Sequence, residues 1–275
     1  MVKIEIFELI LKLIIKVISM LKIVLVIIIF SLFSFSAKES AETFKPVITD
    51  GENLTFVASY NMSGLMTDIA EIQSVTSKVS TKTKTLYRLK CTASSYSKWD
   101  TYFKIRDLYE SYITIDTYKP VISKKNIDEG GYKKEVSSTF NYSNKIIKNK
   151  VIKHGKEDSF DTVFQGSLYD LVSSVYHIRT LDYDKFTVGK VIAISVLIDG
   201  KIHKINAKYL GTENISVGKY GNKKCYKLSI SVNEKELKKA AGSKFIWLIA
   251  DSKRVPALIK AEIPIGSVQV RLSNM

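Results

Sequence analysis

Residues 191–210 read VIAISVLIDGKIHKINAKYL, and this stretch decides the fold class. Two runs rich in Ile, Val and other strand-forming residues flank the Asp199-Gly200 pair. An Asp-Gly pair readily adopts the positive φ angles of a two-residue turn whose twist matches that of antiparallel strands. The stretch therefore predicts a β-hairpin with one strand on each side of Asp199-Gly200.

The pattern of this hairpin recurs toward both ends of the chain. Apolar residues alternate with polar ones, which is typical of strands that bury one face. The predicted strands include residues 54–60, 87–93, 105–117, 132–142, 245–250, 255–263 and 267–272. Glu129-Gly130-Gly131 predicts a second tight hairpin, and Asp251 to Arg254 predicts a turn before the last strands.

Helical periodicity is confined to short segments. An apolar stripe over 168–176 predicts one helix that ends near Arg179, with Ser167 and Asp170 as its capping residues. Shorter helices are predicted over 95–103 and 234–241. Together with about ten strands, these helices predict a mainly β fold, an antiparallel sheet curled into an open β-barrel with one covering helix and one or two short helices.

The amino terminus has the layout of an export signal. Met20, Leu21 and Lys22 precede an unbroken apolar run, Ile23 to Phe33, and small residues follow it. We expect residues 1–36 to be a signal peptide cleaved before Ala37, with Met20 as an alternative start. The other interpretation is an uncleaved membrane anchor over residues 20–36. Residues 37–50 are a polar linker, and 51–275 form a single β-rich domain.

The chain is strongly basic, with 42 Lys+Arg against 27 Asp+Glu and a net charge of +15. Loss of residues 1–36 removes four lysines and two glutamates, which leaves 38 bases, 25 acids and a net charge of +13. Two interpretations stay open, a lysine-rich background composition and a site for an anionic envelope glycan or lipid. Nucleic acid is not an expected partner because only five arginines are present.

The sequence contains no recognisable catalytic or cofactor motif. Three histidines, His154, His177 and His203, lack metal-ligand spacing, and neither a nucleophile elbow nor a phosphate-binding loop occurs. Catalytic, cofactor and metal residues are therefore all predicted to be absent. Carboxylates are the remaining catalytic material, and the neighbouring pairs are Asp107 with Glu110, Asp128 with Glu129, and Asp182 with Asp184.

Two further features suggest structural roles. Cys91 and Cys225 could form a disulfide after export into an oxidising compartment, or they could be two buried free thiols. Arg179 and Arg254 are rare arginines in a lysine-rich chain, and their planar five-donor groups cannot be replaced by an ammonium group. We expect carboxylates or carbonyls to hold both arginines near the helix end and the last hairpin.

Several blocks of sequence, in their order along the chain, resemble an uncharacterised family of exported bacterial proteins, domain-of-unknown-function family 3108. The resemblance covers nearly all of residues 51–275. Its blocks are Gly51 to Phe56, Tyr102 to Asp107, Glu129 to Gly131, Tyr169 to Leu171 through Tyr176 to Arg179, and Trp247 to Asp251 through Arg254 to Pro256. The resemblance implies a secreted β-barrel-like fold and supplies no activity. It adds Trp247 and Asp251 to the structural candidates.

These observations favour a non-catalytic binding or assembly factor of the periplasm or outer envelope, acting on an envelope polymer, a lipid or a protein partner. The alternative is a carbohydrate-active hydrolase that uses a carboxylate pair. Such an enzyme needs two carboxyl groups converging in a concave pocket. A third possibility is a carrier for acyl chains, which would need a deep, dry apolar cavity.

Overall fold

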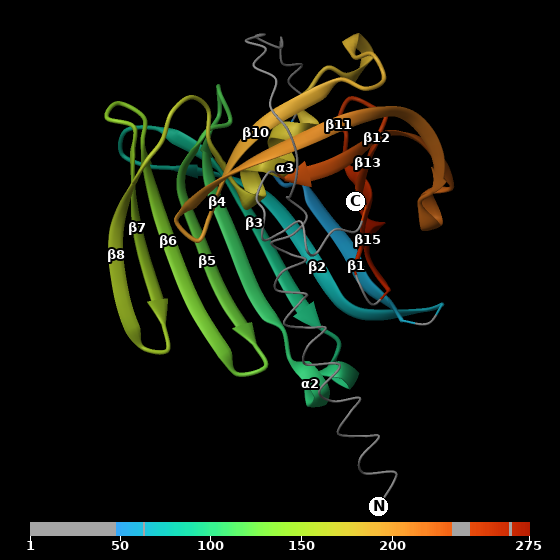
Figure 1. Cartoon of the computed structure of the whole chain (residues 1–275), viewed down its shortest axis with the longest axis horizontal. Helices are drawn as coiled ribbons and strands as arrows, with labels where there is room; N and C mark the ends of the chain where they lie inside the picture. Colours follow the sequence, from blue (N-terminus) through green and yellow to red (C-terminus); the bar gives the residue numbers. More distant parts are fainter. Residues whose placement is uncertain (1–47, 63, 233–242, 264–265) are drawn as a thin grey trace, which may run out of the picture.

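The computed structural model describes residues 48–62, 64–232, 243–263 and 266–275. In these residues all the strands belong to one sheet (Figure 1). The first eight strands are β1 (Asn53–Met62), β2 (Leu65–Ser80), β3 (Thr85–Ser95), β4 (Arg106–Thr114), β5 (Pro120–Glu129), β6 (Tyr132–Asn141), β7 (Ile146–Lys153) and β8 (Lys156–Val163). The others are β9 (Tyr169–Asp170), β10 (Val191–Ile198), β11 (Lys201–Ser216), β12 (Asn222–Val232), β13 (Lys244–Ile249), β14 (Pro256–Glu262) and β15 (Ser267–Asn274).

The sheet is a rolled meander that does not close. Its strand order is β8-β7-β6-β5-β4-β3-β2-β1-β15-β14-β13-β12-β11-β10-β9, and its pairs are antiparallel except β9 with β10. The β1–β15 pair joins the two halves of the chain. The β10–β11 hairpin then returns over the first half, where Leu197 packs against Phe140 and Ile147. The predicted mainly β, open barrel-like fold is confirmed.

The number of strands exceeds the predicted ten. Residues 105–163 fold into five strands, β4 to β8, and the lysines of β5 and β7 and the polar residues of β8 hide the alternation that identifies strands. Both predicted two-residue turns are present. Gly130 and Gly131 have φ angles of 53° and 86°, and Asp199 and Gly200 have φ angles of 51° and 78°.

The helices of the described residues are α2 (Ser97–Phe103) and α3 (Leu171–Arg179), with single 3₁₀ turns η1 (Tyr183–Lys185) and η2 (Gly218–Tyr220). The predicted start of the covering helix was wrong. Asp170, not Ser167, is the N-cap, because its carboxylate accepts from the backbone of Val172 and Ser173. Residue 168 lies before the helix, since Tyr169 and Asp170 form β9 beside β10. The helix predicted at 234–241 lies outside the described residues.

Helix α3 defines the inner face of the sheet. It contacts β3, β4 and β10, and Tyr176 packs in one apolar cluster with Tyr87, Leu89 and Ile113. On β4 the odd-numbered residues point to this inner face, and the even-numbered ones point to the opposite, outer face. Five apolar clusters pack among the described residues. No helix among the described residues is long and apolar enough to cross a bilayer.

Candidate functional site

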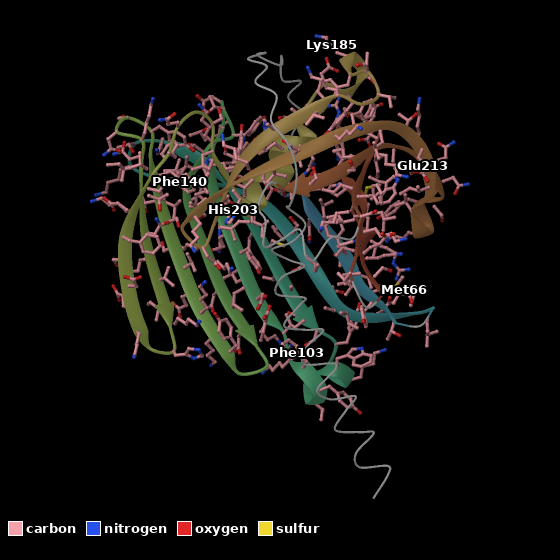
Figure 2. All side chains as sticks on the ribbon, viewed as in Figure 1. Met66, Phe103, Phe140, Lys185, His203 and Glu213 are labelled. Carbon is pink, nitrogen blue, oxygen red and sulfur yellow. The ribbon has the colours of Figure 1, made fainter. Side chains whose placement is uncertain are left out.

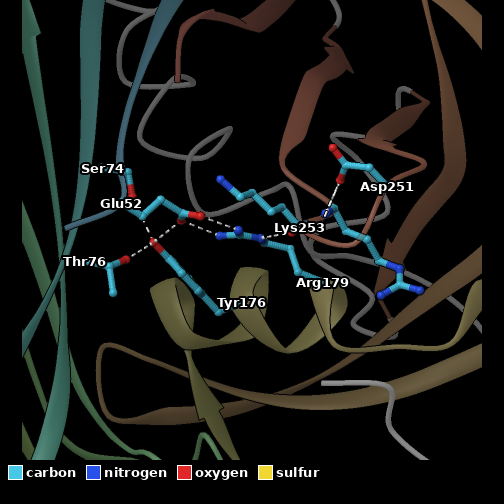
Figure 3. A network of polar contacts seen from close by, with 8 residues as sticks. Glu52, Ser74, Thr76, Tyr176, Arg179, Asp251 and Lys253 are labelled. Carbon is cyan, nitrogen blue, oxygen red and sulfur yellow. Dashed lines mark hydrogen bonds and ion pairs between the residues drawn. The ribbon is translucent and has the colours of Figure 1, made fainter. Parts of the chain in front are cut away.

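A buried polar network joins α3 to the start of β1 and to the loop before β14 (Figure 3). Arg179, whose side chain is 1% exposed, donates from Nη1 and Nη2 to the Glu52 carboxylate at 2.8 and 2.7 Å. Its Nε donates to the Lys253 carbonyl at 3.1 Å. The Tyr176 ring lies 4.8 Å from the guanidinium carbon, and its hydroxyl hydrogen-bonds Thr76 Oγ1 at 2.8 Å. Arg179 therefore contacts both a carboxylate and a carbonyl.

The other predicted structural residues surround the loop before β14. Asp251 accepts from the backbone of Lys253 and Arg254 at 3.0 and 2.8 Å, which organises the turn (Figure 3). Arg254 is buried, has a positive φ of 47°, and lies 5.9 Å from the ring centres of Tyr183 and Tyr226. Trp247 is also buried.

The Trp247 indole donates to Glu213 at 3.1 Å. The four structural candidates therefore lie in or against the C-terminal half of the sheet. None of them lines either of the two cavities described below.

The two cysteines are free thiols, which corrects the disulfide alternative. Cys91 lies in β3 and Cys225 in β12. The strands β2, β1, β15, β14 and β13 separate them in the sheet. Burial raises the pKa of Cys91 to about 12 and that of Cys225 to about 11, so both stay protonated and unreactive at neutral pH.

The carboxylate pairs that neighbour one another in sequence do not converge. Asp107 points inward from β4, whereas Glu110, three residues away, points outward and is ion-paired with Arg88. Asp128 lies 4.0 Å from Lys133. Asp182 and Asp184 are also separated, since Asp182 contacts Lys185 and Asp184 accepts from the Tyr226 hydroxyl.

A different pair of carboxyl groups meets on the inner face. Asp107 hydrogen-bonds Glu129, which follows it across the β4–β5 hairpin, and its Oδ1 accepts from the Asp128 backbone at 3.1 Å. Burial and the neighbouring Glu129 raise the pKa of Asp107 to about 7. Two carboxyl groups in hydrogen-bond contact leave no room for a sugar between them, whereas a glycosidase separates its two by about 5 Å or more.

A second inner polar cluster lies where the β10–β11 hairpin meets the first half of the sheet. Asp199 accepts from Lys125 Nζ at 2.9 Å and from Lys134 Nζ at 2.8 Å. Although burial raises the pKa of Asp199, the two lysines outweigh it and hold that pKa below its usual value. The adjoining cavity, lined by Tyr109, Asp170 and others, has a volume of about 50 Å³ and fits a few water molecules.

A larger cavity opens on the outer face of β4 to β7, and we call it the outer groove. Its volume is about 340 Å³, within the range of about 300–1,000 Å³ found for ligand sites. Two transverse rows of paired residues line it. One row is Glu110, Lys124, Ser137 and Lys150, and the other is Leu108, Asn126, Glu135 and Ile152.

One lysine of the outer groove lies beside a tyrosine ring. Lys124 Nζ is 5.9 Å from the Tyr112 ring centre, and no described residue forms an ion pair with it. Lys150, half-exposed, is paired with Glu157 at 2.8 Å. Since Glu110 is already ion-paired with Arg88, Lys124 can offer its charge to a ligand.

The histidines are dispersed in the structure. His177 stacks on Tyr169 at 4.2 Å, and burial lowers its pKa to about 4. His154 contacts the Tyr132 ring in an exposed turn, and His203 lies in β11. In the described ranges, no three His, Cys, Asp or Glu residues are grouped so as to hold a metal ion.

Two comparisons match this chain to known proteins. A family model described as "Protein of unknown function (DUF3108)" matches residues 55–273. The fold is similar to the crystal structure of a beta-barrel-like protein of domain of unknown function DUF1849 from Brucella abortus. The TM-score is 0.52 at 7% identity, over 81% of this chain and 95% of that one. This likeness concerns the fold alone. No curated protein matches the sequence.

Proposed function

We propose, for a chain that belongs to the DUF3108 family of proteins of unknown function, that it is an exported, non-catalytic protein that binds an anionic glycan of the cell envelope. The outer groove carries this proposal. It is the larger of the two cavities described above and the one whose lining residues combine lysine charge, hydrogen-bonding side chains and apolar surface.

The groove chemistry fits an acidic sugar chain. Lys124 supplies positive charge, and Lys150 adds a second lysine beside its partner Glu157. Asn126 and Ser137 supply an amide and a hydroxyl for sugar hydroxyl groups, and the exposed Glu135 sets the end of the positive part of the groove. Leu108 and Ile152 provide apolar surface for the faces of the rings. Because the groove lies open on a strand surface, a polymer can pass through it without its ends being buried.

A hydrolase is the less favoured function because of the geometry of the acids. Glu110 in the groove is ion-paired with Arg88, and the inner pair Asp107–Glu129 is in direct hydrogen-bond contact. Neither arrangement provides a protonated acid and a free carboxylate on opposite sides of a bound sugar. The two cavities described above also differ from the deep apolar space that an acyl carrier needs.

Export is part of the proposal and is supported by the sequence pattern of residues 1–36. Intact-mass analysis of the protein recovered from the periplasm or medium of a producing bacterium should give a chain that begins at Ala37. A mass that retains Ile23 to Phe33 would instead indicate an anchored protein.

Binding is tested by titrating the processed protein with a purified acidic polysaccharide at low and high salt. We expect saturable binding that weakens as salt rises, because lysine attraction is screened over about 10 Å at 0.1 M salt. The double change Lys124→Gln and Ser137→Ala should reduce affinity by about tenfold or more.

Lys208→Gln is the matched control, because this exposed lysine lies on β11 away from the groove. Equal loss in the control would mean that binding reflects net charge alone. Absence of binding at low salt would refute the glycan proposal and leave a protein partner as the next hypothesis.

A further inference from the structure

Helix α2 carries aromatic side chains that the fold does not bury. Its seven residues, SKWDTYF, include Trp99, Tyr102 and Phe103, and none of the seven is buried. Tyr102 is 48% exposed. The helix projects beyond the lower edge of the sheet in Figure 1, and Figure 2 shows Phe103 at the same edge. Tyr102 is exposed and Trp99 and Phe103 are half-buried, so this short helix shows solvent an amount of aromatic surface that needs an explanation beyond core packing.

Contacts to the scaffold hold this helix in place. The Trp99 indole donates to the Asp68 carbonyl at 2.9 Å, and the Gly130 amide donates to the Lys104 carbonyl at 2.9 Å. The Phe103 ring lies so close to Gly130 that a β-carbon there would come within 2.6 Å of it. The aromatic surface is therefore presented by a fixed element.

Lysines surround the aromatic helix along this edge, which we call the basic rim. The antiparallel meander places α2, the β5–β6 turn and the β7–β8 turn at one end of their strands. The exposed lysines there are Lys98, Lys104, Lys133, Lys153 and Lys156. Of the acids at this edge, Asp100 is ion-paired with Arg106 and Glu157 with Lys150. Asp128 lies 4.0 Å from Lys133, one of the five lysines, so the rim keeps an excess of positive charge.

We infer that the basic rim is a docking surface for an anionic lipid bilayer, with α2 lying in the interface. Trp and Tyr rings are enriched at the boundary between water and acyl chains because each has an apolar body and a polar tip. Lysines that flank them attract anionic headgroups, and several lysines are needed for firm attachment. The rim combines both features, whereas the outer groove contains no exposed aromatic anchor. This inference is independent of the proposed glycan site.

Trp99 provides a local probe of the contact. The chain has two tryptophans, and Trp247 is buried in β13, so a quencher in the lipid can reach Trp99 alone. The processed protein is mixed with vesicles of phosphatidylglycerol and phosphatidylcholine that contain brominated acyl chains. We expect co-flotation at low salt, quenching of part of the tryptophan emission, and loss of that quenching in Trp99→Phe. Vesicles of phosphatidylcholine alone should bind about tenfold or more weakly.

Charge reversal separates the rim from the general basicity of the chain. Lys98→Glu with Lys104→Glu should lower affinity for the anionic vesicles by about tenfold or more. Lys82→Glu with Lys84→Glu is the matched control, since both lysines are exposed in the turn at the other end of β2 and β3. The control pair should change the affinity by about twofold at most.

Three results would overturn the inference. They are no binding to anionic vesicles at low salt, binding without quenching of Trp99, or an equal loss of affinity in the two charge-reversed pairs. Far-UV circular dichroism of each variant confirms that the sheet has folded. Tyr102→Ser, a change at an exposed position, should weaken binding without moving the thermal unfolding midpoint.

Discussion

Replacing Asp107 by asparagine should stabilise the protein much more at pH 8 than at pH 5. Asp107 is 4% exposed and hydrogen-bonds the side chain of Glu129. Its folded-state pKa is about 7, whereas its ordinary value is 3.8. Between these values the folded protein holds a proton that the unfolded chain has released. The free energy of unfolding therefore falls as pH rises from about 4 to 7 and levels off above that.

The magnitude follows from the size of the shift. A difference of about three pKa units, at about 1.4 kcal/mol per unit, corresponds to a loss of about 4 kcal/mol across this range. The substituted amide is neutral at every pH, and its side-chain oxygen can still accept from the Asp128 backbone N–H that Asp107 binds. The variant should therefore recover about 2–4 kcal/mol at pH 8 relative to the wild type.

Urea unfolding at pH 5 and pH 8, followed by far-UV circular dichroism, measures both proteins. Asp128→Asn is the control, because Asp128 neighbours the pair but points to the outer face beside Lys133. A gain over the wild type that is no larger at pH 8 than at pH 5, or an equal gain in the control, would contradict this prediction.

The remaining predictions concern the packing of the barrel. Arg179→Lys should cost about 3–5 kcal/mol, because one ammonium group cannot satisfy Glu52 and the Lys253 carbonyl together; an unchanged melting temperature would contradict this. Gly200→Ala should destabilise the protein by about 1–3 kcal/mol, since its β-carbon would lie 2.4 Å from the Phe160 ring. Gly155 has a similar φ but open space around it, so Gly155→Ala should lower the melting temperature less than Gly200→Ala does. Equal losses in the two variants would show that the contact with Phe160 is not the cause. Thiol titration of the unfolded protein without reductant should count two free cysteines, and reductant should leave the melting temperature unchanged; a count of zero would indicate the disulfide.

Local sequence determined the turns and much of the sheet. Asp199-Gly200 and Gly130-Gly131 require positive φ angles that other residues adopt at a cost, so their positions can be read without any knowledge of the rest of the fold. Strands with one buried face were also predictable. The strands β5, β7 and β8 were harder, because lysine occupies both faces of β5 and polar residues dominate β8.

The start of the covering helix shows where local rules become ambiguous. Both Ser167 and Asp170 suit a helix N-cap, and the sequence pattern pointed to an early start. Pairing of Tyr169 and Asp170 with β10 selects the later one. That pairing joins segments more than twenty residues apart, so no local window contains the deciding information.

The sequence by itself determined the β-rich class, the tight turns and the basic, lysine-rich character of the chain. Only the tertiary structure decided which side chains meet. Arg179 reaches Glu52 across 127 residues, Asp107 finds Glu129 rather than Glu110, and the outer groove appears only when four strands pair in register. The physical reason is that backbone propensity acts over a few residues, whereas strand register and the rolling of the sheet are set by burial over the whole domain.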